Sequence, residues 1–449
     1  MGRNRDMGPG NKDLWWRRSR STKIKALTLS GPIGSRRRSI IMQGRKHCES
    51  RHNKDNQPNK RQAESNLCHV KRKEVCSLTW VRRKSWPDIE HDLCEPLRIV
   101  DLFSGCGGLT LGAWEAARIH GRKLDIRLAI DVSTDSINVY KANFKTTENI
   151  ARQADIKSSL PGYFGSRLGR AEHNLQDEVG NVDLIVAGPP CQGHSDLNNS
   201  TRRRDPRNEL YLKVIRSVEL FNPKAIIIEN VPTVIHDKEN VVQRSLISLQ
   251  ALGYNVTSTV INAYDLGLPQ HRKRHVLCAV KNTQFNAVDC FSSIRYKKTS
   301  VSDYLAGLED ESSSKEGIYY APSRMSESNQ ERVAYLFKNK AYNLPNSLRP
   351  ICHRDKDHSY VSMYGRLRWD QPAQTITSGF GSMGQGRYVH PHRRRTLTPH
   401  EAARLQGFPE FYDFSIVKKR TILQEMIGNA VPPRLAAILV SELMINKLL

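Results

Sequence analysis

The chain contains few acidic residues and no long hydrophobic run. Its 449 residues include 45 Asp and Glu against 70 Lys and Arg, which leaves a formal net charge of +25 at pH 7. An excess of positive charge of this size indicates a polyanionic partner, either a nucleic acid or an acidic membrane surface. No apolar stretch approaches the roughly 20 residues that a membrane-spanning helix needs, and this excludes an integral membrane protein.

Features of secreted proteins are also missing. The sequence does not open with the charged and then apolar segments of a signal peptide. Its nine cysteines are odd in number and widely spaced, which is typical of a reducing compartment. We therefore expect a cytoplasmic protein, associated with the nucleoid in a bacterial cell. Cysteine and histidine gather between residues 47 and 94, but without the C-x2–4-C pairs of zinc sites, so we expect no metal site.

The positive charge is concentrated near the N-terminus. Residues 1–95 hold 23 Lys and Arg and 10 Asp and Glu, a net +13, whereas the remaining 354 residues hold 47 and 35, a net +12. The first segment shows no sustained hydrophobic period of 2 or 3.6 residues. We predict a largely disordered basic arm over residues 1–95, with a small folded module near residues 68–86 as the alternative.

An ordered domain is predicted from residue 97 onward. Residues 97–103 form a short apolar run that ends in Ser104-Gly105-Cys106-Gly107-Gly108, and a helical pattern follows. This order of strand, glycine turn and helix opens the nucleotide-binding half of a doubly wound sheet. The dinucleotide fingerprint G-x-G-x-x-G fails because Thr110 takes its third glycine position, and no Lys-Ser/Thr pair of a P-loop follows.

The alternation of strands and helices continues and predicts an α/β fold with a doubly wound, mostly parallel sheet. Asp131 closes the second strand, at the position where an acid usually holds a ribose hydroxyl. In such folds, ligands bind beyond the carboxyl ends of the strands. The later strands are expected at 125–130, 183–187, 225–228, 256–262 and 275–280, with helices at about 208–220 and 240–252.

Three strand ends carry unusual residues. Pro189 and Pro190 stiffen the backbone before Cys191, which suits a nucleophile, although a buried, inert thiol is the ordinary fate of cysteine. Glu229 follows a very apolar strand, where burial raises the pKa of a carboxyl group as general acid catalysis requires; a structural acid is the alternative. Residues 270–274, Gln-His-Arg-Lys-Arg, would put alternate side chains on one face if the chain is extended there. Arginines so placed could clamp a phosphate or orient a carboxylate, and a solvated basic edge is the alternative.

Six segments that occur in one order resemble the DNA cytosine-5 methyltransferase family. The resemblance covers residues 97–449 and none of the basic arm. The segments are Phe103-x-Gly105-x-Gly107, Pro189-Pro190-Cys191-Gln192, Glu229-Asn230-Val231, Gln270-x-Arg272-x-Arg274, the run from Arg395 to Pro409, and Gly428-Asn429-Ala430-Val431-Pro432.

The resemblance implies the fold of S-adenosylmethionine-dependent methyltransferases, with a smaller target-recognition domain. The implied parts are a catalytic and cofactor-binding domain at 96–285, a target-recognition domain at 286–392, and a segment at 393–449 that completes the catalytic domain. The implied reaction transfers a methyl group from S-adenosylmethionine to C5 of a flipped-out cytosine in a specific double-stranded DNA sequence. It also implies a monomeric modification enzyme of a restriction-modification system, with a cognate endonuclease that acts on the same site.

Four catalytic residues follow from the resemblance. A thiolate that adds to C6 of cytosine makes C5 nucleophilic, and Cys191 matches that thiol. Glu229 matches the acid that meets the negative charge at N3. Arg272 and Arg274 match a basic pair near the cytosine and the flanking phosphate.

The resemblance also implies the residues that hold the cofactor. Asp131 stands at the ribose position, and Val132 stands where a larger residue often stacks on adenine. Asn429, expected at the start of the last helix, would close the pocket. The full implied set is Phe103, Gly105, Gly107, Leu109, Asp131, Val132, Asp155, Ile156, Pro190 and Asn429.

Target readout is expected within residues 286–392, where Thr375-Ile376 resembles the family's short recognition motif and Arg387 and residues 393–395 could contact phosphates. Two alternatives are open. A tRNA methyltransferase of the same family uses the same cysteine chemistry, but Gly193-His194-Ser195 and the long recognition segment favour duplex DNA. A catalytically silent DNA-binding protein would show decay at Cys191, Glu229 or the arginines, and all are intact.

Overall fold

The computed structural model describes residues 75, 77–88, 94–190, 209–292, 296–308, 315–354 and 362–449. The chain divides into two units, residues 1–57 and 58–449, and every residue described below belongs to the second unit. Most of the predicted basic arm and the loop that contains Cys191 lie outside the described residues. In the described part of the chain, no helix is long and apolar enough to cross a membrane.

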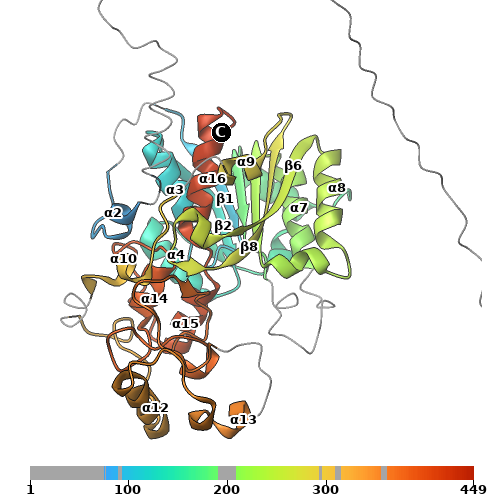
Figure 1. Cartoon of the computed structure of the whole chain (residues 1–449). Helices are drawn as coiled ribbons and strands as arrows, with labels where there is room; N and C mark the ends of the chain where they lie inside the picture. Colours follow the sequence, from blue (N-terminus) through green and yellow to red (C-terminus); the bar gives the residue numbers. More distant parts are fainter. Residues whose placement is uncertain are drawn as a thin grey trace, which may run out of the picture. The chain divides into compact units, whose positions relative to one another are not determined.

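A seven-stranded sheet forms the centre of the second unit, in the order β3-β2-β1-β4-β5-β8-β6 (Figure 1). Neighbouring strands run parallel except for β8, which is antiparallel to both β5 and β6. The predicted doubly wound, mostly parallel α/β fold is therefore confirmed. The strands are β1 (Leu97–Leu102), β2 (Leu124–Asp131), β3 (Ala151–Gln153), β4 (Leu184–Ala187), β5 (Ala225–Asn230), β6 (Tyr254–Asn262) and β8 (Lys273–Lys281).

Helices cover both faces of this sheet because its central strands are apolar on both sides. In β5, Ala225 and Ile227 pack into the core beneath α3 (Gly108–Ile119) and α16 (Pro433–Ile445). Ile226 and Ile228 pack into the core on the other face, beneath α7 (Leu210–Phe221) and α8 (Val241–Ala251). Figure 1 shows these two pairs of helices on opposite sides of the sheet. The remaining helices of this part are α4 (Thr134–Phe144), α5 (Ile156–Ser159) and α6 (Arg170–Val179), with short 3-10 turns at Pro232–His236 and Ala263–Leu266.

The chain after β8 contributes to the main core and also forms a small core of its own. Val333, Leu336, Tyr364 and Val389 belong to that second core, which lies around α12. The domain boundaries predicted at 285/286 and 392/393 stay predictions. The elements of this part are α9 (Ala287–Ser292), α10 (Val301–Leu305), α12 (Glu327–Lys338), α13 (Ile351–Arg354), β9 (Ala373–Gln374), α14 (Pro399–Leu405) and α15 (Arg420–Asn429), with 3-10 turns at Asn346–Leu348 and Met383–Gln385. Strand β9 pairs with β7 (Gln270–His271), which precedes β8 in the chain.

A short N-terminal stretch, residues 77–88, packs against the chain near α14, and we call it the docked segment. It contains the one-turn helix α2 (Leu78–Val81), which Ser77 caps by accepting a hydrogen bond from the Trp80 N–H. Trp80 is 2% exposed, and Trp86 packs against Trp114 with ring centroids 4.8 Å apart. The N–H of Phe411 donates to the carbonyl of Arg83 at 3.0 Å. These contacts fix a segment that the sequence analysis assigned to the basic arm, with a small folded module near residues 68–86 as the alternative.

Candidate active site

The carboxyl end of β5 presents a buried carboxylate. Glu229 is the second-to-last residue of β5 and is 6% exposed. Its Oε1 lies 2.6 Å from Nε of Arg274, which the neighbouring strand β8 supplies. Burial raises the pKa of Glu229, and the charges of Arg274 and Arg272 offset part of that rise. The protonated form of Glu229 is therefore favoured to a higher pH than for an exposed glutamate.

Asn230, the last residue of β5, ties this strand end to the one that precedes Cys191. Its side-chain Nδ2 donates to the carbonyl of Pro189 at 3.3 Å, and its Oδ1 accepts from the Val231 N–H at 2.8 Å. Asn230 is buried. Sequence reasoning assigned it no role, although the Glu-Asn pair at a strand end was a signal. Pro190 is partly exposed and is the last described residue before Cys191.

Arg272 makes different contacts from Arg274. Its guanidinium is buried and donates from Nη1 to the carbonyl of Ile376 at 2.8 Å, and from Nη2 to the carbonyls of Gly428 and Ala430, each at 3.0 Å. The family resemblance placed Arg272 with Arg274 near the cytosine, and that role stays a prediction. Gln270 and Arg272 are buried whereas His271 and Lys273 are exposed, as expected where alternate side chains of an extended chain share a face.

The turn after β1 adopts a left-handed backbone at three positions. Phe103, Gly105 and Gly107 have φ angles of 57°, 51° and 84°. A Cβ on Gly107 would lie 2.5 Å from Cε2 of Phe144, so only glycine fits there. A Cβ on Gly105 would meet nothing within 4 Å, so this side of the turn opens on unfilled space.

The ends of β1 and β2 meet at Asp131. Its Oδ2 accepts from the Gly105 N–H at 2.9 Å and its Oδ1 from the Ser133 N–H at 2.8 Å. Burial raises the pKa of Asp131, and these hydrogen bonds oppose the rise. The side chain of Val132 is 65% exposed next to it. The Oγ of Ser104, in the same turn, is buried and has no hydrogen-bond partner in the described part of the chain.

The other residues implied for the cofactor have varied surroundings. Leu109 and Ile156 are core residues, 4% and 2% exposed. Asp155 is exposed and caps α5 by accepting from the Lys157 N–H at 2.9 Å. Asn429 is exposed and is the last residue of α15. It does not start the last helix, because residues 430–432 separate it from α16.

Behind the glycine turn lies a buried polar network that sequence reasoning missed. Thr110 Oγ1 donates to Oδ2 of Asp101 at 2.6 Å and lies 2.9 Å from the hydroxyl of Tyr140. Burial raises the pKa of Asp101 to about 7. Thr110, which breaks the dinucleotide fingerprint, therefore fastens α3 to β1. An aspartate inside an otherwise apolar strand was the available signal.

Two of the arginines expected to contact phosphates have partners within the protein. Arg387 Nη1 donates to the carbonyls of Tyr342 at 2.8 Å and Arg366 at 3.2 Å, and burial lowers its pKa. Arg395 forms a bidentate ion pair with Glu401, with N–O distances of 2.7 and 2.8 Å. In contrast, Arg394 is exposed.

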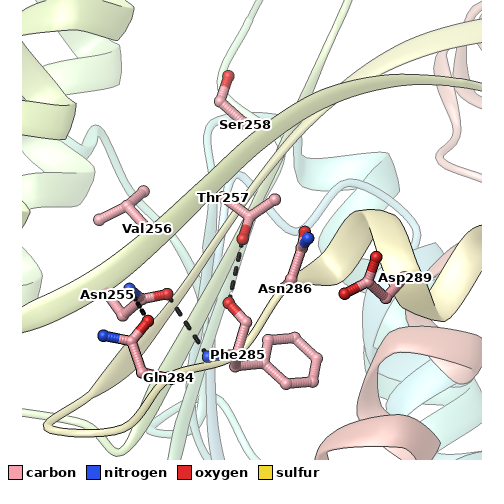
Figure 2. Close-up of a pocket in the computed structure, with 8 residues that line it drawn as sticks. All are labelled: Asn255, Val256, Thr257, Ser258, Gln284, Phe285, Asn286 and Asp289. Carbon is pink, nitrogen blue, oxygen red and sulfur yellow. Dashed lines mark hydrogen bonds between the residues drawn. The ribbon is translucent and has the colours of Figure 1, made fainter. Parts of the chain in front are cut away.

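A surface hollow of about 570 Å³ lies elsewhere, between the first half of β6 and the chain that leads into α9. Figure 2 shows its polar side chains bonded to one another and to the backbone. Asn255 Nδ2 donates to Oε1 of Gln284 at 3.0 Å, and Thr257 Oγ1 donates to the carbonyl of Phe285 at 3.2 Å. These groups fasten α9 to the sheet edge, and none of the predicted site residues lines the hollow.

Comparisons with known proteins agree on one family. A family model described as C-5 cytosine-specific DNA methylase matches residues 97–444. The Type II methyltransferase M1.BsuMI of Bacillus subtilis (strain 168) is 44% identical over 370 residues, which cover 82% of this chain and 84% of that protein. The Type II methyltransferase M1.HphI of Haemophilus parahaemolyticus is 30% identical, over 76% of this chain and 85% of that one. The crystal structure of S. pombe Dnmt2 methyltransferase shares the fold, with a TM-score of 0.55, 19% identity, and coverage of 78% of this chain and 98% of that chain.

Proposed function

The chain belongs to the C-5 cytosine-specific DNA methylase family, and from that premise we propose that the carboxyl ends of β1, β2, β4 and β5 form its active site. Its reaction is the transfer of a methyl group to C5 of cytosine in DNA. The observation that carries the proposed site is the buried Glu229 carboxyl group, 2.6 Å from the Arg274 guanidinium at the end of β5. Such a pair at the ligand-binding edge of the sheet suits acid catalysis on a nucleobase.

Cys191 is the proposed nucleophile. Its thiolate adds to C6 of the cytosine, the electrons of the C5–C6 double bond form a C4–C5 double bond, and C5 of the resulting enamine forms the new bond to the methyl group. Loss of the C5 proton then restores the double bond and expels the cysteine thiolate. Asn230, by its hydrogen bond to Pro189, supports the backbone that leads to Cys191.

Glu229 is the proposed acid. Addition of the thiolate pushes electrons toward N3 of the cytosine, and a protonated Glu229 meets that charge by giving N3 a proton. The carboxylate that results has the Arg274 guanidinium beside it, so it is not left as an isolated buried charge. Arg272 acts as a positioning residue in this scheme, because its donors hold Ile376, Gly428 and Ala430.

The residues around the glycine turn fit S-adenosylmethionine. The unpartnered Oγ of Ser104, the open side of Gly105 and the Asp131 carboxylate offer polar groups and space for its amino-acid and ribose parts. When bound, this cofactor supplies an electrophilic methyl group. Val132 and the pair Asp155 and Ile156 would contact adenine. Phe103, Gly107, Leu109, Pro190 and Asn429 complete the proposed set.

The substrate of this proposal is a specific sequence in double-stranded DNA. The two relatives named above are Type II methyltransferases, which supports a modification enzyme of a restriction-modification system. The proposal includes a cognate endonuclease that acts on the same site, and a monomeric enzyme. A tRNA substrate is not favoured, because the matching family model and these relatives are DNA enzymes.

Incubation with labelled S-adenosylmethionine and duplex DNA, followed by sequencing for 5-methylcytosine, tests the function and yields the recognition sequence. Duplexes with 5-fluorocytosine at the mapped site test the mechanism, because fluorine at C5 blocks the final elimination and traps the covalent complex. Cys191→Ser should abolish both methylation and trapping and leave cofactor binding unchanged. Cys94→Ser, which changes an exposed cysteine, is the matched control. Methylation by the Cys191→Ser enzyme would end the assignment.

A further inference from the structure

Three arginines and two aromatic rings gather beside α12, and we call them the arginine–aromatic cluster. The guanidinium carbon of Arg366 lies 4.7 Å from the ring centroids of both Phe337 and Tyr342. The guanidinium of Arg368 lies 4.4 Å from the Tyr342 ring, and that of Arg394 lies 6.0 Å from the Phe337 ring. The rings thus link the three cations in one row.

The backbone fixes this row. The N–H of Arg366 donates to the carbonyl of Tyr342 at 2.9 Å, and the N–H of Leu367 donates to the carbonyl of Val389 at 2.9 Å. Leu367 is buried, so Arg366 and Arg368, one residue before and after it, project from the other side of an extended segment. Arg387 adds a second donor to the Tyr342 carbonyl.

Among the described residues, no carboxylate forms an ion pair with the arginines of this cluster. In the part of the chain that the structure describes, none of Arg366, Arg368 and Arg394 forms an ion pair with Asp or Glu. Other arginines of the fold do so, such as Arg395 with Glu401 and Arg404 with Glu410. The Nε of Arg366 is buried and has no hydrogen-bond partner in this part of the chain.

Guanidinium groups that stack on rings and pair with no carboxylate of the described residues point to an anionic ligand. A guanidinium that stacks on a ring gives up none of its in-plane N–H donors, and those donors match phosphate oxygens in a bidentate geometry. Arg368 and Arg394 are exposed, so their donors reach solvent. A hollow of about 390 Å³ adjoins the cluster and is lined by Phe337, Tyr342, Arg366, Leu367, Trp369, Pro391 and His392.

We propose that the arginine–aromatic cluster binds phosphodiester groups of the DNA backbone beside the target site, with Phe337 and Tyr342 as positioning residues that hold the guanidinium groups apart and in register. The inference rests on the proposed duplex DNA substrate. Phosphate contacts of this kind fix how a protein sits on the duplex and carry no sequence information themselves.

The salt dependence of DNA binding tests the proposal. On duplex DNA, each phosphate that a protein neutralises contributes about 0.9 to the slope of log K against log salt concentration. In the full-length protein, the double variant Arg368→Gln/Arg394→Gln should therefore make this negative slope shallower by about 1.8 on a random-sequence duplex. Fluorescence anisotropy at a series of salt concentrations measures it. Both residues are exposed, so the variant should keep the melting temperature of the wild type.

Arg244→Gln is the matched control, because Arg244 is exposed on α8, which packs against β6 and α7 on the other side of the sheet from α3 and α16 (Figure 1). Its slope should stay at the wild-type value. An unchanged slope in the double variant, or an equal fall in Arg244→Gln, would overturn the proposal. Absence of methylation by the wild-type enzyme on any duplex would instead overturn the proposed function.

The positioning role of the rings has a separate readout. Tyr342→Leu leaves every arginine in place but removes the ring that contacts two of them, and it should weaken DNA binding and lower the salt slope. Tyr342→Phe keeps the ring and should restore both to wild-type values. A Tyr342→Leu enzyme with the wild-type slope would show that the ring does not position the guanidinium groups.

Discussion

Glu229 is buried at a strand end where a carboxylate alone would be unfavourable. Burial of an unpaired charge costs several kcal/mol, and a carboxyl group in this position responds by keeping its proton. The Arg274 guanidinium at 2.6 Å limits this effect, so the group is able to hold a proton and also to release it. A carboxyl group that works in both states is what transient protonation of a base requires.

Glu229→Gln should lower kcat by about 10²–10⁴-fold, because the amide keeps the shape of the side chain but cannot deliver the proton. The sign of the pH dependence follows from the raised pKa of Glu229. In the proposed mechanism the protonated form of Glu229 is the active one, so wild-type kcat should fall as pH rises through that pKa, and the variant should lack this limb. Because the pKa of Glu229 is raised in the folded state, protonation of Glu229 stabilises the fold at low pH. This contribution to the free energy of unfolding is lost as the pH rises through the folded-state pKa.

Glu115→Gln is the control for this experiment. Glu115 is also buried, burial also raises its pKa, and it pairs with Arg118 on α3. It should keep the wild-type kcat and pH profile even where its stability changes. An equal kcat in Glu229→Gln and the wild type would move the acid to another residue.

At the scale of elements, the docked segment contributes core that lies outside the residues matched by the family model. Trp80 belongs to the same hydrophobic core as the sheet, and the carbonyl of Val81 accepts hydrogen bonds from the Glu410 N–H at 3.1 Å and from Arg404 Nη1 at 2.6 Å. Because Arg404 also pairs with Glu410 at 2.8 Å, the segment covers a charged group that is itself buried. Detaching it would expose both the apolar surface and this ion pair.

Trp80→Ala should destabilise the protein by up to about 3–5 kcal/mol, the usual range for a buried tryptophan. The destabilisation is smaller if the segment detaches as a unit, because detachment relieves the cavity. Differential scanning calorimetry should show a lower melting temperature, and limited proteolysis should cut near residue 80 earlier than in the wild type. Ile247→Ala, at an exposed position of α8, should match the wild type in both. A wild-type melting temperature and cleavage pattern for Trp80→Ala would mean that the docked segment adds no stability.

Local pattern predicted the elements of the sheet well, because strands such as β4 and β5 are continuous apolar runs that end at glycine, proline or charged residues. It marked Glu229 and Arg274 as separate candidates, and the ion pair between them comes from the structure. It offered a folded module near residues 68–86 but could not predict where the docked segment packs, since the partners of Val81 lie more than 300 residues away at Arg404 and Glu410. The contacts of Arg272 could not be predicted for a related reason: its three acceptors come from two distant segments, and no spacing along the chain reveals them.

At the scale of the whole molecule, the basic residues behind the net charge of +25 fall into two groups: those that pair with carboxylates, and those in the N-terminal segment. In the described part, many arginines are neutralised by carboxylates, as Arg216 is by Glu172 and Arg98 by Asp183. Residues 1–57 contain 15 Lys and Arg and 4 Asp and Glu, so they carry a net +11 that the family resemblance does not explain. A charge of that density attracts the DNA backbone without regard to sequence.

Deletion of residues 1–57 should therefore weaken binding to random-sequence duplex DNA and flatten its salt dependence, by nearly one unit of slope for each phosphate that the segment neutralises. The cut belongs at residue 57, before the docked segment, because a cut at residue 90 would also remove Trp80 and lower stability for an unrelated reason. The truncated enzyme should keep the melting temperature and the single-turnover rate on saturating DNA.

A full-length variant with the 15 basic residues of this segment changed to Gln separates charge from chain length. If both variants keep the wild-type slope, the N-terminal charge does not touch DNA, and the basic residues of the second unit, the arginine–aromatic cluster among them, carry the whole electrostatic attraction.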